Sequence, residues 1–332
     1  MINAIKEHLS FYKEIEDIDI VKLIYQNSFG FGHFLDEKNG FKRLIKDIES
    51  STEISDVEPE KIGNEISRVH LANYKNGKKS IKNLWILLYE SSFIEMDNAK
   101  ENFMENIKDV SLYFNRPKLL DLGARIKEDD FKPISHSPRY KKLYNPSYRI
   151  INNGFKRYEE ILNYVEKNQD NFIIAIDGSS CSGKTTLSNI MEKYFDVSVV
   201  SIDDFFLPPE VKNSEREYNI NFHLERYIEE VIPFLGKEPF EYGVYNCKEK
   251  KITHNKIIEK KKIIVEGVYS CYPLISEYYN KSYFFEIDFD TQMKRWNKRS
   301  PNIPKELINE WVEKEKKYYN EILHTNNNII FM

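Results

Sequence analysis

The chain has 332 residues, of which 41% are hydrophobic, and its formal net charge is −4. This length predicts two domains, or one domain with a large extension, and the slightly acidic charge balance disfavours a nucleic-acid partner. The three cysteines are widely separated and form no C-x-x-C pair, which disfavours both a zinc site and a disulfide framework.

The sequence also lacks the features of a secreted or membrane protein. Residues 1–8 do not contain the apolar core of a signal peptide. The longest apolar runs, such as residues 84–89, are far too short to span a bilayer. We therefore expect a soluble cytoplasmic protein with no membrane partner. The oligomeric state is open, and a homo-oligomer is compatible with the sequence.

Residues 1–165 are predicted to form a mainly α-helical N-terminal domain. In Ile81–Phe93, for example, the apolar residues recur at the three-and-four spacing of an amphipathic helix. A further helix is predicted to end near Leu143, because Pro146 cannot continue it. The Tyr-Asn-Pro-Ser-Tyr-Arg stretch that follows is predicted to be a turn.

Four residues of this domain are candidates for a functional role: His33, His136, Tyr148 and Arg149. One hypothesis is that the aromatic residues of this region tie the N-terminal domain to the rest of the chain. The other is that the four residues complete an acceptor pocket or sense a ligand. A metal site formed by His33, His70 and His136 has little support from spacing alone.

From residue 172 onward, short β-branched and aromatic runs alternate with helical stretches. The predicted strands are Phe172–Ile176, Val197–Ile202, Ile263–Glu266, Tyr283–Ile287 and Asn328–Phe331. Such alternation predicts βαβ crossovers, and hence an α/β fold with a parallel sheet and helices on both faces. A small hairpin is predicted at residues 242–253. We place this second domain at residues 166–332, after a linker helix at about 154–168.

Residues 178–185 read Gly-Ser-Ser-Cys-Ser-Gly-Lys-Thr, a complete G-x-x-x-x-G-K-[ST] phosphate-binding loop. The loop follows a predicted strand and opens a predicted helix, the context in which this motif binds a nucleoside triphosphate. Lys184 would reach the β- and γ-phosphates, and the Thr185 hydroxyl would hold Mg²⁺. The expected cofactors are therefore ATP and Mg²⁺. The predicted nucleotide-binding residues are Gly178, Ser179, Ser180, Cys181, Ser182, Gly183, Lys184, Thr185 and Thr186.

Acidic residues follow two of the other predicted strands. Asp203 and Asp204 come directly after the second strand, where they would emerge in the ligand crevice of the sheet. Asp203 is the candidate base that accepts the proton of a substrate hydroxyl; the alternative is an aspartate pair that caps a turn or helix. Glu266 ends the third strand and would hold Mg²⁺ together with Thr185 and Asp203; the alternative is a surface carboxylate.

The stretch after the fourth strand carries two candidate catalytic arginines. Arg295 and Arg299 are four residues apart and share one face of a predicted helix. They would close over the triphosphate and neutralise charge on the transferred group; the alternative is that they only solvate the helix. In the last helix, Glu315 falls inside an apolar stripe, where an unpaired charge is costly. We expect a cationic partner for it, such as a lid arginine, or else a position at the edge of the stripe in contact with water.

Together these motifs resemble those of the uridine kinase family of P-loop kinases, over roughly residues 165–332. The resemblance implies that Asp203 is the base, that Glu266 and Gly267 form the family's Glu-Gly strand end, and that Arg295 and Arg299 are lid arginines. The candidate acceptor-binding residues are Asp204, Phe206, His223, Arg226 and Tyr245.

The sequence departs from the family at two positions, because His223 and Asn246 stand where the family has aspartates. Neutral histidine and asparagine accept fewer hydrogen bonds from a ribose diol than a carboxylate does. This difference weakens the case for a ribonucleoside acceptor.

The expected activity is transfer of the γ-phosphate of ATP to a hydroxyl of a small-molecule acceptor, most simply a nucleoside. Glycerate or another small polyol is the alternative acceptor. A different hypothesis is a non-catalytic regulator, in which ATP binding reorganises the N-terminal domain. A GTPase is disfavoured because the chain has no Asn-Lys-x-Asp motif.

Overall fold

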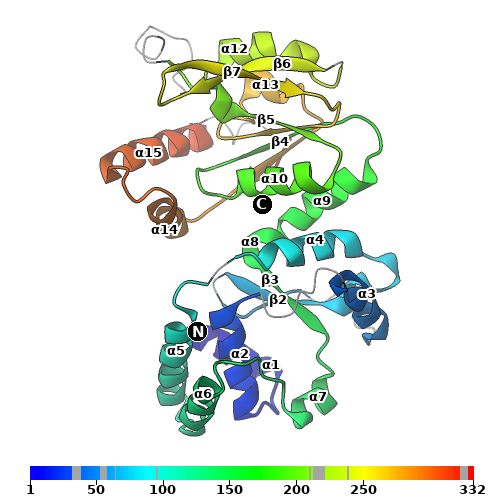
Figure 1. The fold of residues 1–332 in the computed structure, drawn as a ribbon, viewed down its shortest axis with the longest axis vertical. Coiled ribbons are helices and arrows are strands. Elements are labelled where there is room, and N and C mark those ends of the chain that lie inside the picture. The colour runs from blue at the N-terminus through cyan, green and yellow to red at the C-terminus, as the bar shows by residue number, and fades with distance from the viewer. Residues whose placement is uncertain are drawn as a thin grey trace. The chain divides into compact units, whose positions relative to one another are not determined.

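The computed structural model describes residues 1–31, 39–52, 58–63, 65–94, 96–208, 211, 221–237, 239–321 and 328–332. The chain divides into two compact units, Met1–Asn163 and Tyr164–Met332, which can be followed by colour in Figure 1. Each unit has its own hydrophobic core. None of the described helices is long and apolar enough to cross a membrane.

The N-terminal unit is built mainly from helices. Local signals start several of them: the Ser80 hydroxyl accepts from Asn83 N at the start of α4, and Ser137 followed by Pro138 starts α7. Helices α5 and α6 pack against α2. The helices of this unit are α1 (Ile2–Phe11), α2 (Asp17–Phe29), α3 (Gly40–Ser50), η1 (Leu71–Gly77), α4 (Ile81–Ser91), α5 (Ala99–Tyr113), α6 (Lys118–Glu128), α7 (Pro138–Tyr144) and α8 (Asn153–Lys156), and α9 (Tyr158–Lys167) runs into the second unit.

This unit also contains an antiparallel sheet that the sequence analysis missed. Its strands are β1 (Glu60–Lys61), β2 (Ile66–His70) and β3 (Tyr148–Asn152), in the order β1-β2-β3. The prediction of a turn at Tyr148 and Arg149 was therefore wrong. Every residue of β2 is buried, polar ones included, so the strand shows no alternation of polar and apolar residues. Its pairing with β3, some 80 residues away along the chain, is not visible in a local pattern.

A polar network surrounds Arg68, which is fully buried in β2. Its guanidinium donates to Gln26 Oε1 at 2.6 and 3.1 Å, lies 3.5 Å from Glu60 Oε2, and stacks 4.4 Å from the ring centre of Tyr148. Glu60 Oε1 lies 3.0 Å from His70 Nε2. Burial alone would raise the pKa of Glu60, but the hydrogen bond from His70 and the charge of Arg68 outweigh it and lower that pKa to about 2.

The Glu60→Gln variant is expected to lose stability in a pH-dependent way. A carboxyl whose folded pKa lies below its ordinary value of 4.5 stabilises the fold above that value, and it loses this contribution as the pH falls toward about 2. At about 1.36 kcal/mol per pKa unit, the wild type should be more stable by about 3 kcal/mol at pH 7. Urea unfolding at pH 7 and pH 3 tests this, because the gap should roughly halve at the lower pH. An equal gap at both pH values would rule out the ionised, paired Glu60.

The C-terminal unit is built on a parallel sheet whose described strands follow the order β10-β9-β4-β8-β5. Strands and helices alternate along the chain, which confirms the predicted α/β fold. Strands β6 and β7 form a separate hairpin, which includes the hairpin predicted at residues 242–253. The strands of this unit are β4 (Ile173–Gly178), β5 (Ser198–Ser201), β6 (Phe240–Asn246), β7 (Lys251–Ile258), β8 (Ile263–Glu266), β9 (Lys281–Phe285) and β10 (Ile329–Phe331). The helices are α10 (Lys184–Tyr194), η2 (Ile202–Phe205), α12 (Leu224–Glu230), η3 (Ile232–Phe234), α13 (Pro273–Ser276), α14 (Phe289–Arg299) and α15 (Lys305–Glu321).

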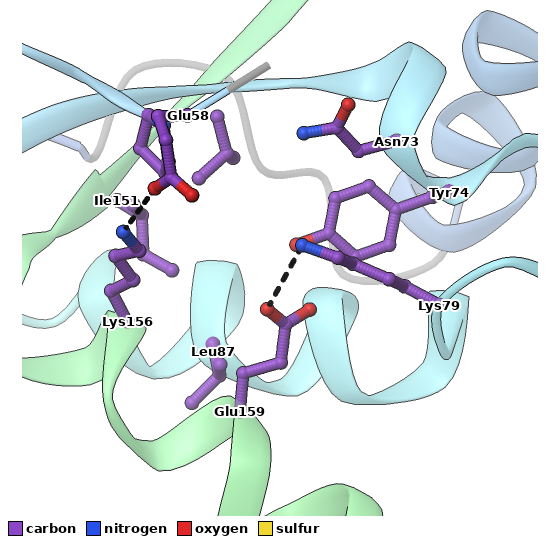
Figure 2. A pocket seen from close by; sticks show the side chains of 10 residues that line it. Glu58, Asn73, Tyr74, Lys79, Leu87, Ile151, Lys156 and Glu159 are labelled. Carbon is purple, nitrogen blue, oxygen red and sulfur yellow. Dashed lines mark hydrogen bonds and ion pairs between the residues drawn. The ribbon is translucent and has the colours of Figure 1, made fainter. Parts of the chain in front are cut away.

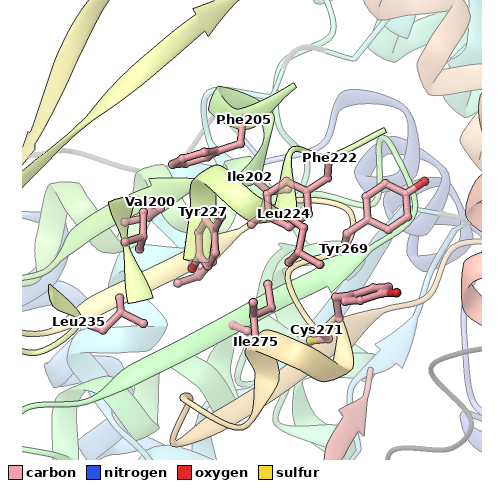
Figure 3. Packing of buried hydrophobic residues seen from close by; sticks show 14 of the residues in the cluster. Val200, Ile202, Phe205, Phe222, Leu224, Tyr227, Leu235, Tyr269, Cys271 and Ile275 are labelled. Atoms are coloured by element: carbon pink, nitrogen blue, oxygen red, sulfur yellow. The ribbon is translucent and has the colours of Figure 1, made fainter. Parts of the chain in front are cut away.

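Helices cover both faces of this sheet. On one face, Val200 of β5 packs in a cluster with Leu224 of α12 and Ile275 of α13, as Figure 3 shows. In Figure 1, α10 lies on the opposite side of the sheet from α12 and α13. Because the strands are parallel, the carboxyl ends of β4, β5 and β8 meet at one edge, at Gly178, Ser201 and Glu266. Ligands bind at this edge in open α/β sheets.

Candidate active site

The phosphate-binding loop connects β4 directly to α10. Gly178 has a φ of 142°, and a Cβ at this position would lie only 2.4 Å from the Phe285 carbonyl oxygen on β9. Gly183, with a φ of 102°, is the N-cap of α10. Side chains would be strained at both positions, so glycine permits the sharp turn from strand to helix. This is the geometry in which successive main-chain N–H groups cradle a phosphate.

Lys184 lies within this loop. The residue is only 7% exposed, and its ammonium group donates to the carbonyl oxygens of Gly178 at 2.8 Å and Ser179 at 3.0 Å. The loop therefore holds a positive charge beside its own main chain. A cation in this position can stabilise the charge of a β- or γ-phosphate.

Glu266 at the end of β8 faces the start of α10. Its carboxylate accepts from the Thr185 hydroxyl at 3.1 Å and from the Ser201 hydroxyl at 3.0 Å. Burial raises the pKa of Glu266, the charge of Lys184 opposes this rise, and the charge of Asp203 adds to it. Ser201 lies opposite Glu266 in the sheet, and the exposed Asp203 follows two residues later. Lys184, Thr185, Asp203 and Glu266 therefore lie at the same edge of the sheet.

The same residues fit a magnesium ion. The hydroxyl of Thr185 and the carboxylates of Glu266 and Asp203 offer only oxygen donors, which Mg²⁺ prefers. In the part of the chain that the structure describes, no three His, Cys, Asp or Glu side chains gather into a metal cluster. Mg²⁺ is commonly held by one or two protein carboxylates and takes its other ligands from water and phosphate.

Helix α14 brings both predicted lid arginines to the phosphate-binding loop. Arg295 Nη1 donates to the Cys181 carbonyl oxygen at 3.0 Å. Burial raises the pKa of the Cys181 thiol, and the charge of Arg299 together with its hydrogen bond opposes that rise. Arg299 therefore lies beside the same loop residue. This placement favours the lid hypothesis over arginines that only solvate the helix.

Glu315 of α15 has neutral partners, so the expectation of a cation or of water was wrong. The residue is 7% exposed. Its carboxylate accepts from the Ser180 main-chain N–H at 3.0 Å, from the Ser180 hydroxyl, and from Gln292 Nε2 at 3.1 Å. Gln292 also donates to the Ser180 carbonyl oxygen at 3.2 Å. Gln292 was missed, although it stands three residues before Arg295 on the same helix.

The Glu315→Ala variant is expected to weaken ATP binding and to lower the free energy of unfolding. It leaves the Ser180 N–H without its acceptor, which costs about 1–3 kcal/mol when the group is buried, and it frees one side of the loop. Calorimetric titration with ATP and thermal unfolding would measure the two effects. The matched control is Glu313→Ala, an exposed glutamate on the same helix. Equal ATP affinity in the two variants would show that the loop does not depend on Glu315.

Asp177, directly before the loop, is a second buried carboxyl that the sequence analysis missed. It accepts from Cys271 N at 2.8 Å, from the Tyr318 hydroxyl at 2.6 Å and from Tyr269 N at 3.2 Å. Burial raises its pKa to about 6 against the effect of these bonds. A polar residue ending an otherwise apolar strand was the available signal. Through Tyr318 and Glu315, α15 thus holds both the strand end and the loop.

The predicted acceptor-binding residues lie around η2, α12 and the hairpin, and two of them have strong protein partners. Asp204 accepts from the Tyr242 hydroxyl at 2.8 Å. Arg226 donates to both carboxylate oxygens of Glu230, at 2.7 and 2.8 Å, and to the Gly243 carbonyl oxygen at 2.7 Å. Both side chains therefore tie the hairpin to its neighbours, a structural task that the sequence did not predict.

The other predicted acceptor-binding residues belong to the same region. Phe206 pairs with Phe222 in an isolated β-bridge, and Tyr245 is buried in β6. His223 Nδ1 lies 3.1 Å from Glu225 Oε2 at the start of α12. In the N-terminal unit, His136, Tyr148 and Arg149 line one cavity, and His33 lies outside the described residues.

Comparison with known proteins supports the kinase motifs. Over 137 residues the chain is 30% identical to human nicotinamide riboside kinase 1, and the match covers 39% of this chain and 65% of the relative. This chain resembles a small-molecule kinase. It spans a little less than two thirds of that relative's length. No protein-family model matches the chain.

Two solved structures are similar to part of the chain. One is a possible uridine kinase from Bacillus stearothermophilus, with 15% identity and a TM-score of 0.40 over 53% of this chain and 97% of that protein. The other is a fructose transport system kinase candidate from Silicibacter sp. TM1040, with 17% identity and a TM-score of 0.35 over 43% of this chain and 79% of that protein.

Proposed function

We propose that this protein is an ATP-dependent kinase that transfers the γ-phosphate to a hydroxyl group of a small metabolite, most simply a nucleoside. The observation that carries the proposal is the arrangement at the sheet edge. Lys184 lies inside the phosphate-binding loop, Thr185 contacts Glu266, and Asp203 comes two residues after Ser201, which pairs with Glu266. This arrangement supports the proposal of a phosphate-binding group, a magnesium site and a carboxylate base at one edge of the sheet.

Each residue has a defined task in the transfer. Main-chain N–H groups of the loop and Lys184 hold the β- and γ-phosphates in place, and Arg295 and Arg299 neutralise charge on the transferred group. Asp203 orients the acceptor hydroxyl and takes its proton as the hydroxyl oxygen bonds to the γ-phosphorus and ADP leaves. Mg²⁺ held by Thr185, Glu266 and Asp203 would supply further neutralisation of phosphate charge.

A nucleoside acceptor is supported by the sequence match to nicotinamide riboside kinase 1. Against it stand His223 and Asn246, where the uridine kinase family has aspartates, and Arg226, whose guanidinium is bound by Glu230 and Gly243. Glycerate and other small polyols therefore remain the second class of acceptor in this proposal.

The test is a panel of acceptors offered to the purified protein with ATP and Mg²⁺, with ADP release as the readout. Nicotinamide riboside, uridine, cytidine, glycerate and fructose cover the classes named above. We expect acceptors of one class to stimulate ADP release and those of the other classes to have little effect. The same rate of ADP release with and without every acceptor would contradict the proposal.

A further inference from the structure

We propose that the N-terminal unit has a ligand site of its own, for a small anion that carries a flat ring. The site is a cavity of about 610 Å³, and all the described residues that line it belong to this unit. This volume lies within the range of about 300–1,000 Å³ that is usual for metabolite pockets. Nothing in the proposed phosphotransfer uses it, so the two proposals stand or fall separately.

The charge of the lining favours an anion. Among the described residues, four cations line the cavity, Lys22, Arg43, Lys141 and Arg149, together with one carboxylate, Asp47, which is already bound by Arg149. Burial lowers the pKa of Lys22 to about 8, and the charges of Arg68 and Lys141 lower it further. Cations that repel one another in a half-buried cavity are stabilised when an anion binds among them.

Three polar residues of the lining, Gln26, His136 and Tyr148, are fixed by hydrogen bonds and form what we call the polar floor of the cavity. His136 Nδ1 lies 2.8 Å from Asp19 Oδ1, and His136 Nε2 lies 2.6 Å from the Tyr148 hydroxyl. Gln26 Nε2 donates to the same hydroxyl at 3.1 Å. Burial lowers the pKa of His136, so the imidazole is neutral: it donates to Asp19 and accepts from Tyr148. Because these partners are mutually satisfied, the floor keeps its shape before a ligand arrives.

The lining also includes apolar side chains. Trp85, Phe31, Leu44 and Leu88 contribute to it, and Trp85 is only partly buried. Trp85 lines the cavity, and an indole can stack against a flat ring. Anion-binding and ring-binding side chains in one cavity match a phosphate or carboxylate joined to a planar ring, and a nucleoside monophosphate has both parts.

A second cavity of the same unit, drawn in Figure 2, lacks these features. Its volume is about 100 Å³, too small for a metabolite. Two ion pairs cross it, Glu58 with Lys156 at 3.0 Å and Lys79 with Glu159 at 4.0 Å. Its charges are thus paired within the protein, and the larger cavity is the better candidate.

The test is titration of the full chain with UMP, AMP and inorganic phosphate while tryptophan emission is recorded. The two nucleotides should quench the emission saturably, the quench should disappear in Trp85→Phe, and phosphate alone should bind more weakly because it has no ring. Lys141→Ala and Arg43→Gln should each raise the Kd roughly tenfold. The matched controls are Lys142→Ala and Lys42→Gln, at neighbouring exposed residues. These two substitutions should leave the Kd unchanged.

Three results would overturn this site. The first is no saturable quench with any of the three probes. The second is an equal loss of affinity in the control variants, which would indicate non-specific attraction to surface charge. The third is loss of the signal in Lys184→Ala, which would place the nucleotide at the phosphate-binding loop. Lys42, Arg43, Lys141 and Lys142 are exposed, so the variants at these four positions should fold.

Discussion

Replacing Asp203 by Asn should lower kcat about 100- to 10,000-fold, the range in which general base catalysis contributes. Asparagine keeps the size of the side chain but cannot take the proton of the acceptor hydroxyl. Asp203 is exposed and is only one of three proposed Mg²⁺ ligands, so ATP affinity should fall far less than kcat. Steady-state ADP release at saturating acceptor measures kcat, and calorimetric titration measures the affinity.

The neighbouring aspartate provides the control for this prediction. Asp204 accepts a hydrogen bond from Tyr242, and burial raises its pKa. The Asp204 side chain therefore contacts the hairpin, and in Asp204→Asn the amide oxygen can still accept from the Tyr242 hydroxyl. We expect this variant to retain kcat within about threefold. If the two variants lost activity equally, or if Asp203→Asn remained fully active, Asp203 would not be the base.

Replacing Lys184 by Ala should lower kcat/KM for ATP by at least about 100-fold, as removal of one preorganised charge-stabilising group does. Lys184 is buried in the loop and holds its positive charge beside the carbonyl oxygens of Gly178 and Ser179. Alanine removes the charge that would face the β- and γ-phosphates in the proposed mechanism. Initial rates at varied ATP concentration measure the loss.

Lys193→Ala, at the other end of α10, is the matched control for this variant. Lys193 is exposed and lies over the ring of Tyr194, far along the helix from the loop. It should have wild-type kinetics and nearly wild-type stability. A Lys184→Ala variant that turns over ATP as fast as Lys193→Ala would exclude the loop as the site of catalysis.

Much of the C-terminal unit could be predicted because its signals are local. The strands of a parallel sheet are buried on both faces, so they stand out as short apolar runs. The glycines of the phosphate-binding loop and the acidic residues at strand ends come immediately after those runs in the sequence, so their positions could be predicted. Parallel connectivity then places the carboxyl ends at one edge, which is why Lys184, Glu266 and Asp203 could be assigned to one site.

The parts that could not be predicted depend on contacts between distant residues. Glu315 accepts a hydrogen bond from Ser180, which lies 135 residues earlier in the sequence. The spacing of apolar residues in α15 does not indicate which donors bind this carboxylate. In the N-terminal unit, Arg68 and His70 of β2 are buried. Polar residues of this kind are usually exposed, so the sequence does not indicate that this strand is buried. Only the folded chain shows that Glu60, Gln26 and Tyr148 compensate the buried charge.

Phosphate transfer by this protein can be followed directly with ATP labelled at the γ-phosphate. The labelled nucleotide is incubated with Mg²⁺, the acceptor that stimulates ADP release, and either the wild type or Asp203→Asn. The wild type is expected to move the label to the hydroxyl of the acceptor, and Asp203→Asn is expected to do so far more slowly. Label that appears only as inorganic phosphate, at the same rate in both proteins, would contradict this expectation.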